Sequence, residues 1–137
     1  MGKFKAIVVE KTASGQRAGL KEFDDSELDG DVAVRVTHSS VNYKDALALD
    51  GRAPIVRKFP LVAGIDFAGE VEESTHPDFA PGDSVVLTGW GAGESRHGGF
   101  AERARWSGDQ LVKLPAGLSA EQAMAIGTAG PSAGLRP

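Results

Sequence analysis

The sequence contains no cysteine in its 137 residues. This absence excludes disulfide bonds, thiolate metal ligands and a cysteine nucleophile, and it fits a protein of the reducing cytoplasm. Histidine is scarce as well, because only His38, His76 and His97 occur and they lie far apart in the sequence. Structural zinc sites combine cysteine and histidine at short spacings. We therefore expect no structural zinc site.

Long apolar runs and clusters of basic residues are also lacking. No apolar stretch approaches the ~20 residues that a membrane-spanning helix needs, and the apolar run near the N-terminus is too short for a signal peptide. The 15 lysines and arginines are scattered and are outnumbered by 19 aspartates and glutamates. Binding to nucleic acid or to an anionic membrane is thus not favoured. The sequence predicts a soluble, cytoplasmic protein.

Short β-branched or alternating runs separated by turns make up most of the chain. Three valines alternate with other residues in Asp31–Ser40, which is typical of a half-buried strand. Lys5–Glu10 and Gln16–Phe23 flank a turn at Ser14–Gly15 and predict a hairpin. We expect further strands in these runs: Gly64–Glu72, Ser84–Thr88, Gly98–Ala104 and Leu111–Pro115.

Helical spacing is confined to two short segments. Asn42–Asp50 carries apolar residues at helical intervals and is followed by Gly51, and a second helix begins after Ser119 as its N-cap. Six or seven short strands with two or three short helices predict a mainly β fold, a closed or partly closed β-barrel. The chain length fits a single domain, and the 18 glycines suit the corners of a small barrel.

Polar side chains gather where the Asp31–Ser40 strand ends and the next helix begins. Asn42 carries a hydrogen-bond donor and an acceptor, Tyr43 carries a hydroxyl and a flat ring for stacking, and Asp45 can fix a neighbour. At the mouth of a barrel these groups can meet a substrate. The alternative is that Asn42 caps the helix and Tyr43 packs in the core.

Six motifs follow one another along the chain: Asn42–Leu47, Phe59–Gly69, Pro81–Asp83, Leu87–Gly91, His97–Glu102 and Ala125–Gly130. As an ordered set they resemble the medium-chain dehydrogenase/reductase superfamily. Within it, the chain is most similar to the zinc-free branch of acrylyl-CoA reductases and quinone oxidoreductase-like proteins. The resemblance covers nearly the whole chain and implies a GroES-like, partly closed β-barrel.

The resemblance also carries expectations about metal and cofactor. In the zinc-containing alcohol dehydrogenases of this superfamily, three positions of this domain hold the catalytic metal, and here Asn42, Ile65 and Thr128 occupy them. None of these residues supplies the thiolate or imidazole that zinc prefers, so the resemblance implies a site without metal. It implies NADPH as the cofactor, with hydride transfer to the activated C=C bond of acrylyl-CoA or to a quinone.

The same resemblance suggests roles for single residues. Tyr43 is expected to lie against NADPH, with Asn42 and Thr128 lining the nicotinamide end of the cleft. Asp45 is expected to hold the Asn42–Tyr43 segment or to relay a proton. We therefore predict Asn42, Tyr43 and Asp45 as catalytic residues, and Tyr43, Asn42 and Thr128 as cofactor contacts. Asp66 belongs either to this site or to the core as a structural carboxylate.

Two loops admit a functional and a structural interpretation. Trp90, in a glycine-rich loop, either borders the entrance for an acyl-CoA or quinone or plugs one end of the barrel. Arg52, Arg57 and Lys58 either meet the phosphates of CoA or form a solvated basic loop.

The family continues beyond Gly130 into a Rossmann domain with a glycine-rich pyrophosphate loop. Gly89–Gly93 lacks the spacing and the following helix of such a loop, so we expect it to be a barrel loop. We predict a GroES-like domain over residues 1–130, an atypical tail over 131–137, in which Pro131 removes a backbone donor, and no Rossmann domain.

Two classes of function remain open at this stage. The first is a catalytic-domain fragment of an NADPH-dependent reductase, inactive alone because the missing domain would hold most of the cofactor. The second is a stand-alone GroES-like binding or assembly module without catalysis. The acceptor, an acyl-CoA or a quinone as in ζ-crystallin-like reductases, is not distinguished. A homo-oligomer is a further possibility, since relatives usually pair through the absent domain.

Overall fold

The computed structural model describes residues 2–51, 55–115 and 117–126. Within these ranges the chain forms eight β-strands, two α-helices and two short 3₁₀ helices. In chain order they are β1 (Lys3–Thr12), β2 (Gly15–Asp24), η1 (Asp25–Glu27), β3 (Val32–Ser39), α1 (Tyr43–Asp50), β4 (Leu61–Val62), β5 (Asp66–Ser74), β6 (Ser84–Thr88), β7 (Arg103–Trp106), η2 (Gly108–Gln110), β8 (Val112–Lys113) and α2 (Ala120–Ile126).

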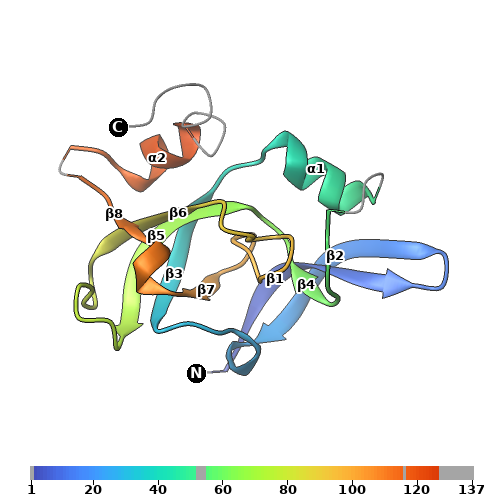
Figure 1. Cartoon of the computed structure of the whole chain (residues 1–137), viewed down its shortest axis with the longest axis horizontal. Helices are drawn as coiled ribbons and strands as arrows, with labels where there is room; N and C mark the ends of the chain where they lie inside the picture. Colours follow the sequence, from blue (N-terminus) through green and yellow to red (C-terminus); the bar gives the residue numbers. More distant parts are fainter. Residues whose placement is uncertain (1, 52–54, 116, 127–137) are drawn as a thin grey trace.

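The strands form two antiparallel sheets. One sheet has the order β2-β1-β4 and the other the order β7-β3-β5-β6-β8. An isolated bridge between Ala6 and Ala101 links them. In Figure 1 the β1–β2 hairpin projects to the right of the larger sheet, and both α-helices lie on the upper side of the view. The mainly β fold is confirmed, and the described strands form an open arrangement, not a closed barrel.

The N-terminal hairpin forms because two alternating runs meet at a glycine-containing turn. β1 and β2 pair without interruption from Lys3–Asp24 to Thr12–Gly15. Phe4, Ala6 and Val8 of β1 are buried, which is the period-two pattern of a strand that covers a core with one face. The predicted hairpin is confirmed and extends further at both ends than the sequence suggested.

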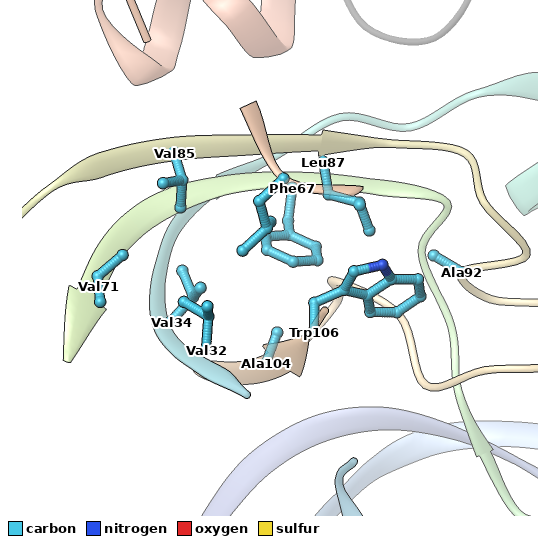
Figure 2. Packing of buried hydrophobic residues seen from close by; sticks show 10 residues of the cluster. Val32, Val34, Phe67, Val71, Val85, Leu87, Ala92, Ala104 and Trp106 are labelled. Atoms are coloured by element: carbon cyan, nitrogen blue, oxygen red, sulfur yellow. The ribbon is translucent and has the colours of Figure 1, made fainter. Parts of the chain in front are cut away.

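The main core lies inside the larger sheet. Trp106 is 1% exposed at the end of β7, and its ring meets the ring of Phe67 edge to face, with 6.3 Å between the centroids. Val32 and Val34 contribute from β3. Figure 2 shows Trp106 and Phe67 in the middle of this cluster, with the valines around them. The strand predicted in Asp31–Ser40 is thus confirmed, although Ala33 on its other face is buried too.

The segment from Gly98 to Ala104 differs from the expectation, because β7 begins only at Arg103. Before it, Gly98 N–H donates to Val62 O at 2.8 Å and Gly99 N–H donates to Gly64 O at 3.1 Å. A Cβ on Gly98 would lie 2.0 Å from Gly64 O, so only glycine permits this close packing. The segment crosses between the two sheets instead of extending one strand. The same contacts stabilise β4, which is too short to be recognised in the sequence.

Both helices occur where the sequence predicted them. Gly51, with a φ of 77°, ends α1 in the left-handed region, and its N–H donates to Leu47 O. At the start of α2, Ser119 Oγ accepts from Gln122 N–H and Gln122 Oε1 accepts from Ser119 N–H, which is a capping box. Met124 of α2 is buried in a small cluster with Ala68. Neither of the described helices is long and apolar enough to cross a membrane.

His97 lies between the sheets and is held in its neutral form. Its Nδ1 accepts a hydrogen bond from Val62 N–H at 3.1 Å, and its ring packs edge to face on Phe23. Burial lowers the pKa of His97 to about 4, and the Lys58 charge adds to this effect. A neutral imidazole is required at this position because a protonated Nδ1 could not accept from Val62.

We expect the stability of the protein to depend on pH through His97. The histidine has a pKa of 6.5 when unfolded and about 4 when folded, so its contribution is complete above pH 6.5 and is lost as pH falls towards 4. With allowance for the partial exposure of His97, the loss is about 2 kcal/mol. Denaturant unfolding of the wild type and His97→Gln between pH 7 and 4.5 measures this. The glutamine can still accept from Val62 but cannot titrate, so identical pH slopes in both proteins would contradict the assignment.

Candidate active site

Asn42 lies at the junction of β3 and α1, where the chain turns from strand to helix. It is the N-cap of α1, with extended backbone angles (φ −110°, ψ 161°). Its backbone N–H donates to Asp45 Oδ2 at 2.9 Å. An acidic residue at the third helical position commonly binds the N-cap backbone in this way. The start of α1 therefore fixes the positions of Asn42 and Asp45 relative to each other.

Asp45 is a buried carboxylate that ties α1 to the beginning of β5. Its side chain is 1% exposed. Oδ1 accepts from Ile65 N–H at 2.9 Å, while Oδ2 accepts from the backbone of Asn42 and, at 3.3 Å, from Asn42 Nδ2. Burial raises the pKa of Asp45, these hydrogen bonds act in the opposite direction, and the Asp66 charge adds to the increase. Asp45 therefore holds a proton up to a higher pH than an exposed aspartate does.

Asp66, the first residue of β5, is the second buried carboxylate of this cluster. Its side chain is fully buried. Oδ1 accepts from Ser40 Oγ at 2.6 Å and Oδ2 accepts from Asn42 Nδ2 at 3.1 Å. The amide nitrogen of Asn42 thus bridges Asp45 and Asp66. We define Ser40, Asn42, Asp45 and Asp66 as the polar cluster.

The polar cluster contains a carboxyl group that favours holding a proton. Burial and the nearby Asp66 charge both raise the pKa of Asp45, so Asp45 is the group of the cluster that is shifted towards its protonated form. Ser40 is half-buried and its hydroxyl donates to Asp66, which connects the buried part of the cluster to the surface. The Ser40–Asp66 hydrogen bond is therefore a short connection between a buried carboxylate and the surface.

Tyr43 lies beside the polar cluster but points away from the core. It is the first residue of α1, and its side chain is 80% exposed. The alternative that Tyr43 packs in the core is therefore wrong. The alternative for Asn42 is correct in part, because Asn42 is the N-cap of α1 while its side chain also binds Asp66. The structure thus brings Asn42, Tyr43 and Asp45 together at one end of α1.

A second loop is fastened to the start of α1. Lys44 Nζ forms an ion pair with Glu94 Oε2 at 2.7 Å, and Gly89 N–H donates to Ile65 O at 2.9 Å. Between these attachments, Trp90 has a φ of 58°, which is unusual for a residue other than glycine, and its side chain is 61% exposed. Both interpretations of Trp90, at a substrate entrance or at one end of the barrel, are compatible with an exposed side chain and stay predictions. Trp90 lies on the surface of the loop that adjoins the polar cluster.

Other predicted residues have separate outcomes. Thr128 and Arg52 lie outside the described residues, as does the tail 131–137. Arg57 and Lys58 are exposed. Ile65 is buried next to Asp45 but contributes only its backbone N–H. Across the described ranges, no group of three or more histidine, aspartate or glutamate side chains is arranged to hold a metal ion.

The sequence did not indicate how Ser40 and Asp66 are connected to Asn42. For Asp66 the sequence left two roles open, a site residue or a structural carboxylate of the core, and Ser40 appeared only as a member of a polar run. The available signal was an aspartate between Ile65 and Phe67, because a charged residue within a buried apolar strand requires a polar partner. That signal reveals the need for a partner but not its identity, since Ser40 and Asp66 are 26 residues apart.

Comparison with known proteins places this geometry in a family. The alcohol dehydrogenase GroES-like domain matches residues 28–116, more than half of the chain. The acrylyl-CoA reductase AcuI of Ruegeria pomeroyi is 49% identical over 130 residues, which are 93% of this chain and 39% of that protein. This chain therefore spans about two fifths of the length of such relatives.

Solved structures agree with this assignment. The Salmonella enterica yhdH oxidoreductase, determined in complex with NADP, is 53% identical and superimposes with a TM-score of 0.89 over 92% of this chain and 39% of that protein. A quinone oxidoreductase from Coxiella burnetii is 27% identical with a TM-score of 0.70, over 93% and 42% of the two chains. The resemblance read from the sequence is confirmed: the chain belongs to the alcohol dehydrogenase GroES-like domain family, within the medium-chain dehydrogenase/reductase superfamily.

Proposed function

We propose that this chain is the substrate-side domain of an NADPH-dependent reductase that acts on the activated C=C bond of acrylyl-CoA or on a quinone. The observation that carries the proposal is the polar cluster, two buried carboxylates bridged by Asn42, lying directly beside the exposed ring of Tyr43. The similarity to an acrylyl-CoA reductase and to an NADP-bound oxidoreductase supports it.

The residues present fit the nicotinamide end of the cofactor. Tyr43 presents a flat, exposed ring on which a planar heterocycle can stack, and the half-buried Asn42 lies next to it. Thr128 is proposed as a further contact. When bound, NADPH supplies the hydride, which adds to the carbon β to the carbonyl. The remainder of the cofactor is proposed to be held by a domain that this chain does not include.

The protein groups have to orient the substrate and deliver a proton to the carbon next to the carbonyl. Asp45 is suited to retain the proton because burial raises its pKa. The half-buried Ser40 hydroxyl connects the Asp66 carboxylate towards the surface. Asn42 positions both carboxylates, because its amide nitrogen donates a hydrogen bond to each of them. We thus assign Tyr43 to cofactor contact and Asn42 and Asp45 to proton handling.

The site is proposed to work without a metal, on the basis of the chemistry of the side chains. Of the positions that hold zinc in other members of the superfamily, Asn42 uses its amide nitrogen to bind two carboxylates and Ile65 is a hydrocarbon. Neither provides the thiolate or imidazole that zinc prefers. The substrate carbonyl is accordingly polarised by hydrogen bonds and not by a metal ion.

A chimera tests this function. Residues 1–130 joined to the part of the Ruegeria pomeroyi reductase that follows the corresponding position should oxidise NADPH in the presence of acrylyl-CoA, whereas the 137-residue chain alone should not. Tyr43→Ala should weaken NADPH binding by the chimera about tenfold, because loss of an aromatic contact of about 1.4 kcal/mol corresponds to that factor.

Val112→Ala removes a similarly exposed apolar side chain from β8 and serves as the control. Equal effects of Tyr43→Ala and Val112→Ala, or no NADPH oxidation by a folded chimera, would contradict the proposal. Steady NADPH oxidation by the isolated chain would contradict the proposal that a further domain is needed to hold the cofactor.

A binding or assembly module without catalysis is the second candidate. Val41, Tyr43 and Trp90 are large, exposed and grouped around α1 and its neighbouring loop, as in a protein-docking surface. A folded chimera that fails to oxidise NADPH, together with a chain that associates in solution, would favour this candidate. The oligomeric state and the cytoplasmic location remain predictions.

A further inference from the structure

A small cavity of about 100 Å³ lies beside Trp106, and no residue of the polar cluster lines it. Trp106 pairs with Val32 at the beginning of β3, whereas Ser40 and Asn42 follow the end of that strand. The cavity is therefore a separate place in the fold. It is lined by residues of η1 and the segment after it, of the segments before β4 and β7, and of β7: Glu27, Asp29, Lys58, Arg96, His97, Arg105 and Trp106.

Arg96 is held in one orientation at this cavity. Its guanidinium carbon lies 4.0 Å from the centroid of the Trp106 ring, and its Nη1 donates to Gln110 Oε1 at 2.9 Å. The same oxygen accepts from Trp106 Nε1 at 2.7 Å, so the glutamine is fixed as well. A guanidinium that is stacked on a ring and held at one nitrogen keeps further N–H groups for an anion, and its planar fork matches oxyanions.

The other half-buried polar groups of the cavity are donors too. His97 Nδ1 accepts from Val62 N–H, so the neutral ring carries its proton on Nε2. Arg105 Nη2 donates to Asp25 Oδ2 at 3.2 Å, which fixes this guanidinium and balances its charge. Lys58 is exposed and adds a positive charge. Donors from three separate segments of the chain thus line one small space.

Glu27 and Asp29 are the two carboxylates that line the cavity, and both are exposed. Within the ranges that the structure describes, neither of them forms an ion pair with Lys58 or Arg96. The half-buried guanidinium of Arg96 therefore lacks a carboxylate partner there. Partial burial of a charge without a counter-charge is unfavourable, and a bound anion offsets this cost. The cavity accordingly favours an anion over a cation.

We propose that this cavity binds a small tetrahedral oxyanion of the phosphate type. Four oxygens can accept from donors that arrive from several directions, whereas the two oxygens of a carboxylate lie in one plane. The cavity is smaller than the sites of drug-sized ligands, so it suits a small ion. The ion contacts His97, which binds β4 of the smaller sheet, and Arg96, which packs on the core of the larger one. The inference is independent of the proposed reductase function.

Inorganic phosphate is the probe. Titrated into the 15N-labelled 137-residue chain at an ionic strength kept constant with sodium chloride, it should shift the amide resonances of residues 96–97 and 105–106 in a saturable manner. Arg96→Gln should weaken this binding about tenfold, because hydrogen bonds between charged groups are lost. Arg17→Gln removes the same charge from an exposed position on β2 and should leave the dissociation constant unchanged.

Urea unfolding gives a second readout, because an ion that binds only the folded chain stabilises it. Phosphate also stabilises proteins in general through its exclusion from their surface, so the comparison has to be made between variants. Phosphate should raise the urea midpoint of the wild type and of Arg17→Gln by more than that of Arg96→Gln. Equal increases in all three proteins would contradict a specific site.

The proposal would also be overturned by the absence of saturable shifts, by shifts confined to other regions, or by acetate binding as tightly as phosphate. If Arg96→Gln fails to fold, Lys58→Gln at an exposed position replaces it, with a loss of about threefold expected. A folded chimera should retain phosphate binding whether or not it oxidises NADPH. Loss of binding in the folded chimera would mean that the added part covers the cavity, and it would reject the site without affecting the proposed function.

Discussion

Replacing Trp106 with alanine should destabilise the protein by about 3–5 kcal/mol, the usual cost of removing a large aromatic side chain from a core. Trp106 is 1% exposed and packs on Phe67. Its Nε1 donates to Gln110 Oε1 at 2.7 Å, and the Arg96 guanidinium lies 4.0 Å from the ring centroid. The substitution removes all these contacts and leaves a cavity in the middle of the cluster (Figure 2). Urea unfolding at pH 7 measures the change in the free energy of unfolding.

The second tryptophan of the chain provides the matched control. Trp90→Ala makes the same chemical change at a side chain that is 61% exposed, so the expected effect is within about 0.5 kcal/mol. The left-handed backbone at Trp90 does not alter this expectation, because tryptophan and alanine are both strained there. A large loss for Trp90→Ala, or a loss below 1 kcal/mol for Trp106→Ala, would be inconsistent with the packing described.

Asp45→Ala should cost about 2–4 kcal/mol, and in the chimera it should also reduce kcat. The substitution leaves the N–H groups of Ile65 and Asn42 without their acceptor, and a buried donor without a partner costs about 1–3 kcal/mol. Part of that cost is offset, because burial already disfavours the charged form of Asp45, as its raised pKa indicates. The Asn42 amide would keep its bond to Asp66 but lose its bond to Asp45. Urea unfolding and NADPH oxidation measure the two effects.

Asp29→Ala is the control for Asp45→Ala. Asp29 is exposed, so removal of its carboxylate should change the free energy of unfolding by no more than about 0.5 kcal/mol. If Asp45→Ala and Asp29→Ala proved equally mild, Asp45 would not organise the junction of β3 and α1. If Asp45→Ala destabilised the protein but left kcat of the chimera unchanged, Asp45 would be structural only.

The tests differ in what they report. Trp106→Ala probes the core of the larger sheet, which is needed for any function of the domain. Asp45→Ala probes the polar cluster, whose composition is costly for stability because two carboxylates are buried close together. Costly buried polar groups are frequently associated with functional sites. The polar cluster is therefore the feature on which the proposed function depends most.

Local structure could be predicted from the sequence with good success. The β1–β2 hairpin, the strand after Asp31 and both helices follow from alternation, turn residues and caps, each of which involves neighbours in the chain. The ordered motifs also identified the superfamily, and with it Asn42, Tyr43 and Asp45 as candidates. These three were accessible because they lie within four positions of one another.

Contacts between distant segments were decided by tertiary structure alone. Asn42 binds Asp66 across 24 positions, and Ser39 binds Gly99 across 60. Such pairs depend on the register of β3 against β5 and on the crossing of residues 98–102 between the sheets, which no local pattern encodes. The exposure of Tyr43 depends on the same packing.

The sequence by itself determined the mainly β character, the positions of the helices, the family and the residues at the start of α1. Only the tertiary structure decided that Asn42 joins two buried carboxylates and that Trp106 fills the core while Trp90 stays exposed. The physical reason is that turn and helix preferences act over a few residues, whereas burial and hydrogen bonding between strands are settled only when the two sheets assemble.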